Sequence, residues 1–180
     1  MVSLDIGCGR NKKEGCIGLD LNGSLEGVDV VHEINRRAYI PFRDNTFEEI
    51  YISDVVEHVD DVPWLMSEVH RIARPEATIH IQYPHYTGRN AYGDVTHKRW
   101  MGGFALDHFI PATEYGDKYR YYTMFGRHFP FRIKTKRFSF KIREIGDILS
   151  KVFGTEICEK YLSAIIPIST VNLELRVLKE

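Results

Sequence analysis

The stretch Leu4-Asp5-Ile6-Gly7-Cys8-Gly9, followed by Cys16-Ile17-Gly18-Leu19-Asp20, decides the fold class of this chain. It predicts a short buried strand, a glycine turn, and a second short strand that ends in an acid. Glycine lacks a Cβ atom, so the backbone of the turn can come close to a ligand. In doubly wound α/β proteins, an acid at the end of the second strand accepts hydrogen bonds from the ribose of a bound nucleotide. The stretch therefore predicts a nucleoside site at the carboxyl ends of two parallel strands.

The composition is that of an ordinary globular domain. The chain has 180 residues, of which 43% are hydrophobic and 27% are charged, so we expect a single domain over residues 1–180. No apolar run is long enough to cross a bilayer, and the first expected strand leaves no room for a targeting segment. Cys8, Cys16 and Cys158 have no metal-ligand spacing and read as free thiols. These features predict a cytoplasmic protein without a membrane partner.

Short apolar runs alternate with loops and helices over the first 83 residues. Runs of this kind, bounded by turn residues, predict strands of a parallel sheet. The expected strands are Val2–Ile6, Cys16–Leu21, Val28–Val31, Ile50–Ser53 and Thr78–Tyr83. A helix is predicted from the N-cap Asp61 to the stop at Pro75. Later in the chain, a helix is expected over residues 141–153, with strands near Glu156–Leu162 and Val171–Lys179.

Residues 84–140 differ in chemistry from the rest. Fifteen of the 22 aromatic residues lie between Tyr83 and Phe140, and residues 118–143 hold nine Lys or Arg and no acid. Apolar and basic residues alternate over 131–136, which predicts a hairpin strand with one solvated face. We interpret residues 84–140 as an insertion, or lid, over the carboxyl ends of the strands, where ligands bind in open α/β folds.

Five stretches together resemble the class I S-adenosylmethionine-dependent methyltransferases, and most closely the small type 11-like group. They are Leu4–Gly9, Gly18–Leu21, Ile40–Ile50, Asp54–Val59 and Arg71–Pro75. The resemblance covers about residues 2–83, the last helix and the last two strands. It implies a Rossmann-like α/β fold of three layers, with a seven-stranded, mostly parallel sheet whose last strand is reversed, and with the insertion after strand five.

The resemblance also implies S-adenosylmethionine as the cofactor. Gly7 and Gly9 would lie against its methionine end, Asp20 would hold its ribose, and Glu33 and Ile34 would flank its adenine. The full set of expected cofactor-binding residues is Asp5, Gly7, Cys8, Gly9, Asp20, Leu21, Glu33, Ile34, Ser53, Asp54 and His58. The link from Gly9 to the second strand is too short for the full first helix of the family.

Three histidines are candidate general bases, which methyl transfer needs when the acceptor carries a proton. They are His58, His85 and His97. Asp94 precedes His97 by three residues, a spacing with which an acid can orient a histidine. Two of them have a structural alternative, in which His58 shapes the turn after strand four and His97 pins the loop together with Asp94. Glu57, His85, Asp94 and His97 could also hold a metal, but no spacing demands one, and no metal is expected.

Several functions compete for this sequence. A dinucleotide site requires a third glycine, and Arg10-Asn11-Lys12-Lys13 follows Gly9 instead, so methyl transfer is favoured over hydride transfer. A small-molecule acceptor with a reactive oxygen is the first hypothesis. The basic, aromatic stretch 118–143 makes RNA a partner to consider, ranked below simple packing and below an anionic or glycosyl substrate, because the acidic remainder repels a polyanion. A non-catalytic cofactor-binding or partner-dependent subunit stays open, as does an oligomer.

Overall fold

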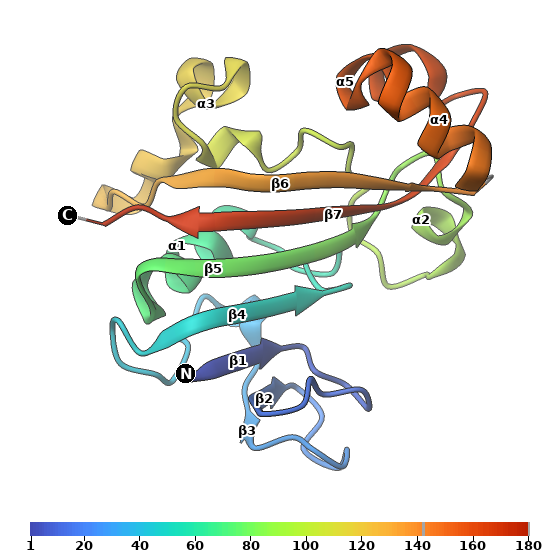
Figure 1. Cartoon of the computed structure of the whole chain (residues 1–180). Coiled ribbons are helices and arrows are strands. Elements are labelled where there is room, and N and C mark those ends of the chain that lie inside the picture. The colour runs from blue at the N-terminus through green and yellow to red at the C-terminus, as the bar shows by residue number, and fades with distance from the viewer. Residues whose placement is uncertain (142, 180) are drawn as a thin grey trace.

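The structure, a computed structural model, describes residues 1–141 and 143–179. A seven-stranded sheet forms its centre, in the strand order β3-β2-β1-β4-β5-β7-β6 (Figure 1). The strands are β1 (Ser3–Ile6), β2 (Cys16–Asp20), β3 (Val30–Val31), β4 (Phe47–Ser53), β5 (Ala73–Pro84), β6 (Phe131–Phe140) and β7 (Ile168–Val177). Strands β1 to β5 are parallel, and β7 is antiparallel to both of its neighbours. The expected sheet with a reversed last strand is confirmed.

The sixth strand lies earlier in the chain than predicted. β6 takes residues 131–140, where apolar and basic residues alternate, so the connection from β5 to β6 is residues 85–130. The strand expected at Glu156–Leu162 is wrong, because these residues form α5 (Thr155–Ile157) and the π-helical turn η4 (Cys158–Leu162). Buried Cys158 and partly buried Leu162 are four residues apart and face the core together, which is a helical spacing.

One face of the sheet is covered, and the other is open over β1, β4 and β5. Along β5, Ile79, Ile81 and Tyr83 are buried, whereas His80 and Gln82 between them are only half-buried. Helix α1 (Val62–Ile72) packs on the buried face, and over residues 1–141 and 143–179 no helix crosses β1, β4 or β5 on the other (Figure 1). The expected third layer is therefore missing there, because residues 7–15 link β1 to β2 by turns alone.

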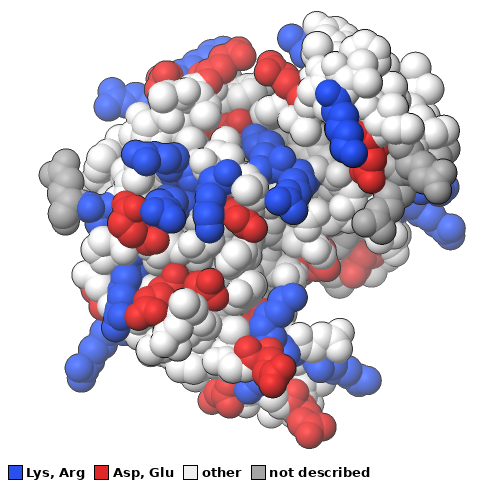
Figure 2. Space-filling model, viewed as in Figure 1, with Lys and Arg blue, Asp and Glu red and all other residues white. Residues whose placement is uncertain are grey.

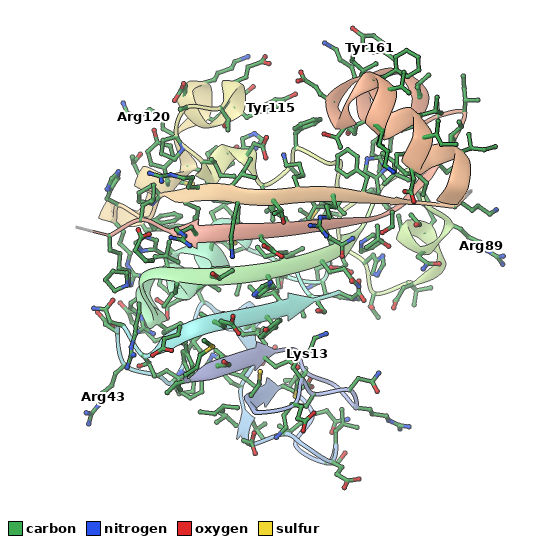
Figure 3. The ribbon with its side chains drawn as sticks, in the orientation of Figure 1. Lys13, Arg43, Arg89, Tyr115, Arg120 and Tyr161 are labelled. Atoms are coloured by element: carbon green, nitrogen blue, oxygen red, sulfur yellow. The ribbon has the colours of Figure 1, made fainter. Side chains whose placement is uncertain are left out.

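The open face is polar. The ring of His80 stacks on that of Tyr51 at 4.5 Å, and Lys13, labelled in Figure 3, lies 5.9 Å from the centre of the Tyr51 ring. A hollow of about 870 Å³ opens over these side chains and Glu174. Figure 2 shows acidic and basic side chains interspersed on this side of the molecule, so it carries no continuous basic surface.

Helix α1 forms as its sequence predicts. Asp61 caps it, since Asp61 Oδ1 accepts a hydrogen bond of 2.9 Å from the backbone N–H of Trp64, and Pro63 occupies its first turn. Leu65 and Val69 are fully buried on the face that packs against the sheet. The helix ends at Ile72, before the predicted stop, because β5 begins at the next residue.

Several helices of three to six residues and the longer α4 fill the remaining connections. They are η1 (Ile34–Arg36), α2 (Arg89–Gly93), η2 (Asp107–Phe109), α3 (Glu114–Tyr119), η3 (Tyr121–Gly126) and α4 (Arg143–Phe153). The ring of His108 lies 4.8 to 5.2 Å from the rings of Tyr115, Tyr119 and Tyr121. These aromatic residues therefore pack on one another. In the part of the chain that the structure describes, no helix is long and apolar enough to cross a membrane.

Buried charges join the 85–130 connection to α1. Fully buried Glu68 accepts hydrogen bonds from Arg71 (2.7 Å), Arg127 (2.8 Å) and the backbone N–H of Ile40 (3.0 Å). Although burial opposes it, these bonds keep the pKa of Glu68 below its usual value. Lys136 likewise pairs with buried Asp107 at 2.6 Å. Two cations of the basic stretch are thus used inside the protein.

Candidate functional site

The glycine turn and Asp20 meet at the carboxyl edge of the sheet, because β1 and β2 are parallel neighbours. The backbone N–H of Gly9 donates to Asp20 Oδ2, and that of Asn22 donates to Asp20 Oδ1, both at 2.9 Å. These bonds orient the carboxylate and leave each oxygen a second lone pair. Asp20 can therefore accept hydrogen bonds from a pair of ribose hydroxyls.

The two glycines of the turn have different reasons to be glycine. Both have positive φ angles, +67° at Gly7 and +52° at Gly9, which alanine adopts only with strain. A Cβ on Gly7 would lie 2.3 Å from Val55 Cγ2, so the turn packs directly against the loop after β4. A Cβ on Gly9 would meet no atom within 4 Å. The backbone at Gly9 therefore faces open space that a ligand can fill.

Acidic side chains hold the shortened link between β1 and β2. Buried Asp5 accepts a 2.8 Å hydrogen bond from the backbone N–H of Lys13, and burial raises the pKa of Asp5. Asp29, which the sequence did not single out, accepts from the N–H of Gly18 (2.7 Å) and from Lys12 Nζ (2.9 Å). Cys8 is buried, and burial raises the pKa of its thiol. It packs beneath the turn as a small side chain.

The other expected cofactor residues lie along the same edge. Leu21 is 64% exposed beside Asp20. Glu33 and Ile34 follow β3, at the start of η1. Ser53 ends β4, and Asp54 follows it with a φ of +54°.

A pocket of about 440 Å³ opens where β4 and β5 end. It joins the loop after β4 to the loop after α2, which are far apart in the sequence. The residues around it are Asp54, Glu57, His58, Gln82, Pro84, Asn90, Gly93, Asp94, His97 and Thr170. The structure thus brings together His58 and His97, two of the three candidate bases.

Glu57 is the buried acid of the pocket. Its side chain is 2% exposed, and neither carboxylate oxygen has a hydrogen-bond partner among the residues that the structure describes. His97 Nε2 lies 3.9 Å from Glu57 Oε1. Burial raises the pKa of Glu57 to about 7, because the low-dielectric surroundings disfavour its charge.

The Nδ1 nitrogen of each of these two histidines is already hydrogen-bonded. His97 Nδ1 lies 3.0 Å from the carbonyl oxygen of Ala91, to which it can only donate. His58 Nδ1 lies 3.0 Å from Thr96 Oγ1, whose own proton goes to Asp94 Oδ1 at 2.6 Å. These bonds leave Nε2 of each neutral ring with its lone pair. Asp94 therefore acts on His58 through Thr96.

The structure does not bring His85 to this pocket. His85 is fully buried, with Nδ1 2.8 Å from Thr87 Oγ1 and Nε2 3.4 Å from Glu159 Oε1. Burial lowers the pKa of His85. Its partners join the end of β5 to η4 and β7, so its contacts are those of a core histidine.

Comparison with known proteins agrees with this geometry. Residues 4–81 match the family model described as a methyltransferase domain. The chain is similar to the solved S-adenosylmethionine-dependent methyltransferases from Mesorhizobium loti (TM-score 0.56, 14% identity, 97% of this chain and 90% of that one) and Archaeoglobus fulgidus (0.58, 20%, 97% and 85%). It is also similar to a methyltransferase in complex with the Haloferax volcanii activator Trm112 (0.57, 13%, 99% and 83%). No curated protein matches the chain.

The residues at the carboxyl edge fit S-adenosylmethionine. Asp20 offers free lone pairs for the ribose, and the open backbone at Gly9 leaves room for the amino-acid end. The side chain of Asp5 lies under the link beyond this turn and is already bonded. It therefore shapes the cofactor loop from beneath.

Proposed function

We propose that this chain, a class I S-adenosylmethionine-dependent methyltransferase, transfers a methyl group to an oxygen atom of a small molecule bound in the pocket where β4 and β5 end. The observation that carries the proposal is the lining of that pocket. It presents a buried carboxylate and two imidazole nitrogens that have lone pairs to offer.

The cofactor would occupy the edge next to this pocket. Asp20 would hold the ribose, the turn at Gly7 and Gly9 would approach the methionine end, and Glu33 and Ile34 would flank the adenine. When bound, S-adenosylmethionine supplies an electrophilic methyl group on its sulfonium. Because Gly7 packs against Val55, the cofactor turn is in direct contact with the loop that carries Glu57 and His58. Cofactor and acceptor would therefore lie side by side.

The lining favours an acceptor that has a proton to give. Lone pairs on Glu57, His58 and His97 suit a hydroxyl group, which must lose its proton as the new O–C bond forms. A volume of about 440 Å³ suits a small molecule. Asp54, Glu57 and Asp94 also place three carboxyl groups around the pocket, which opposes the approach of a nucleic acid. RNA is the weaker candidate for this reason.

Methyl-labelled S-adenosylmethionine would test the proposal. The protein is incubated with a cell extract separated into small molecules and RNA, and mass spectrometry identifies the labelled atom. We expect oxygen-linked label in the small-molecule fraction, which the Asp20→Ala variant fails to produce. Label in RNA, or on nitrogen or carbon, would contradict the proposal.

A partner-dependent subunit is the second candidate, and the open face of β1, β4 and β5 is the observation that favours it. In that case the isolated chain binds S-adenosylmethionine but transfers no methyl group until a second protein is added. Measuring both cofactor binding and the rate of methyl transfer on the isolated chain distinguishes an independent enzyme from a partner-dependent subunit.

A further inference from the structure

We propose that Glu57, His58 and His97 bind a divalent first-row transition-metal ion. The ion would hold the acceptor oxygen, and this role, unlike the binding itself, rests on the proposed function.

The three side chains converge from two loops. One candidate ligand atom from each lies within 4.8 Å of the other two, and the closest approach between Glu57 Oε1 and His97 Nε2 is 3.9 Å. Around a tetrahedral ion with bonds of about 2.1 Å, neighbouring ligands are about 3.4 Å apart. Binding an ion would therefore bring these ligand atoms closer together by about 0.5 to 1.4 Å.

The buried carboxylate of Glu57 points to a missing partner. Both of its oxygens are buried, and neither has a hydrogen-bond partner within residues 1–141 and 143–179, which the structure describes. Buried polar groups in native proteins are nearly always bonded, and buried charges are paired or bind metals. His97 at 3.9 Å is too far to donate a hydrogen bond. A cation between the two would satisfy both oxygens and the histidine.

The hydrogen bonds that His58 and His97 make through Nδ1 resemble those of metal-binding histidines. Such residues usually donate their second ring N–H to a carbonyl or carboxylate, which fixes the ring and directs the lone pair at the metal. His97 does so to the carbonyl of Ala91. His58 Nδ1 instead donates to the hydroxyl of Thr96, which donates in turn to the carboxylate of Asp94. Two histidines oriented in this way beside the buried carboxylate of Glu57 are a second, independent argument for a metal site.

The ligand chemistry selects the metal. Two imidazoles and one carboxylate suit zinc, cobalt, manganese or iron, whereas magnesium prefers oxygen ligands alone. Three protein ligands leave a coordination position open, as in catalytic zinc sites. Because the cluster lines the pocket, this position would face the acceptor. A hydroxyl bound there would lose its proton more easily, and because the ion would occupy the lone pairs of Glu57, His58 and His97, the proton would leave to water.

Metal binding can be measured without cofactor or acceptor. The full chain is stripped with a chelator and titrated with Co²⁺, followed by its visible absorption, and with Zn²⁺, followed by calorimetry. The variants are Glu57→Gln and His97→Gln. The matched control is His128→Gln, which changes an exposed histidine outside the pocket. We expect one ion per chain in wild type and control, with affinity lowered more than about 100-fold in both site variants, beyond the 10–100-fold typical of outer-shell changes.

Thermal unfolding separates a metal ligand from a structural residue. Without metal, Glu57→Gln should be at least as stable as wild type, because it removes an unpaired buried carboxylate. Zn²⁺ should raise the melting temperature of wild type and leave this variant unchanged. The proposal is overturned if wild type binds no ion, or if both site variants bind as wild type does. Metal binding without oxygen methylation would contradict the proposed function alone.

Discussion

The contact between the glycine turn and the loop after β4 can be tested by Gly7→Ala. A Cβ at position 7 would lie 2.3 Å from Val55 Cγ2 and would hold a φ of +67°. The left-handed conformation costs alanine about 1–2 kcal/mol. Overfilling a packed site costs about 1–3 kcal/mol more. We therefore expect Gly7→Ala to lower the free energy of unfolding by about 2–5 kcal/mol.

Gly9→Ala is the matched control. Its φ is also positive, at +52°, but a Cβ there meets no atom within 4 Å. Only the conformational strain of about 1–2 kcal/mol should remain. Urea denaturation at equilibrium measures both variants, with the slope of the transition checked for constancy.

Val55→Ala separates strain from collision. This change removes Cγ2, and the remaining Val55 Cβ lies 3.6 Å from the added atom, an ordinary contact. In the Val55→Ala background, Gly7→Ala should cost no more than Gly9→Ala does in wild type, which gives a coupling energy of about 1–3 kcal/mol. A coupling energy near zero would refute the direct packing of these loops.

Two further predictions concern the rest of the fold. Glu68→Ala should lower the free energy of unfolding by about 3 kcal/mol or more in urea denaturation, because it leaves Arg71 and Arg127 without their buried partner; a loss below about 1 kcal/mol would contradict this. Burial lowers the pKa of His70 to about 4, so unfolding takes up a proton as the pH falls below about 6.5, and stability should drop by up to about 3 kcal/mol between pH 6.5 and 4. His70→Gln keeps a donor for the Leu178 carbonyl and should remove that part of the pH dependence; an unchanged slope would show that other groups cause it.

The first half of the fold follows from local signals. The strand, glycine turn and acid at residues 4–20 form a unit whose parts interact over short distances, so their pattern predicts their structure. The strand wrongly predicted at residues 156–162 shows that apolar content alone does not distinguish a strand from a helix. Cys158 and Leu162 are inward-facing at a spacing of four, and this helical period was present in the sequence.

The missing helical layer follows from chain length. Residues 7–15 are too few for a helix that crosses the sheet and returns. The open face has its own signal in the sequence, because Tyr51, His80 and Glu174 alternate with buried neighbours in their strands. The two-residue period of these strands therefore predicts that one face of the sheet is open to solvent.

The candidate site was only partly predictable. His58 and His97 were singled out by type, but the approach of His97 to Glu57 depends on how residues 85–97 fold back over the sheet, which no local pattern fixes. For His85 a signal did exist. Ile79, Ile81 and Tyr83 are buried in β5. Side chains two residues apart in a strand lie on the same face, so His85 is expected to face the core as well.

Calorimetric titration with S-adenosylmethionine tests the central claim most directly. Wild type is compared with Asp20→Ala and with Asp29→Ala, a control that removes a loop-holding carboxylate which is not proposed to contact the ribose. We predict micromolar binding in wild type and Asp29→Ala, and its loss in Asp20→Ala with the fold retained. Absence of binding in wild type, or equal binding in Asp20→Ala, would contradict the cofactor site.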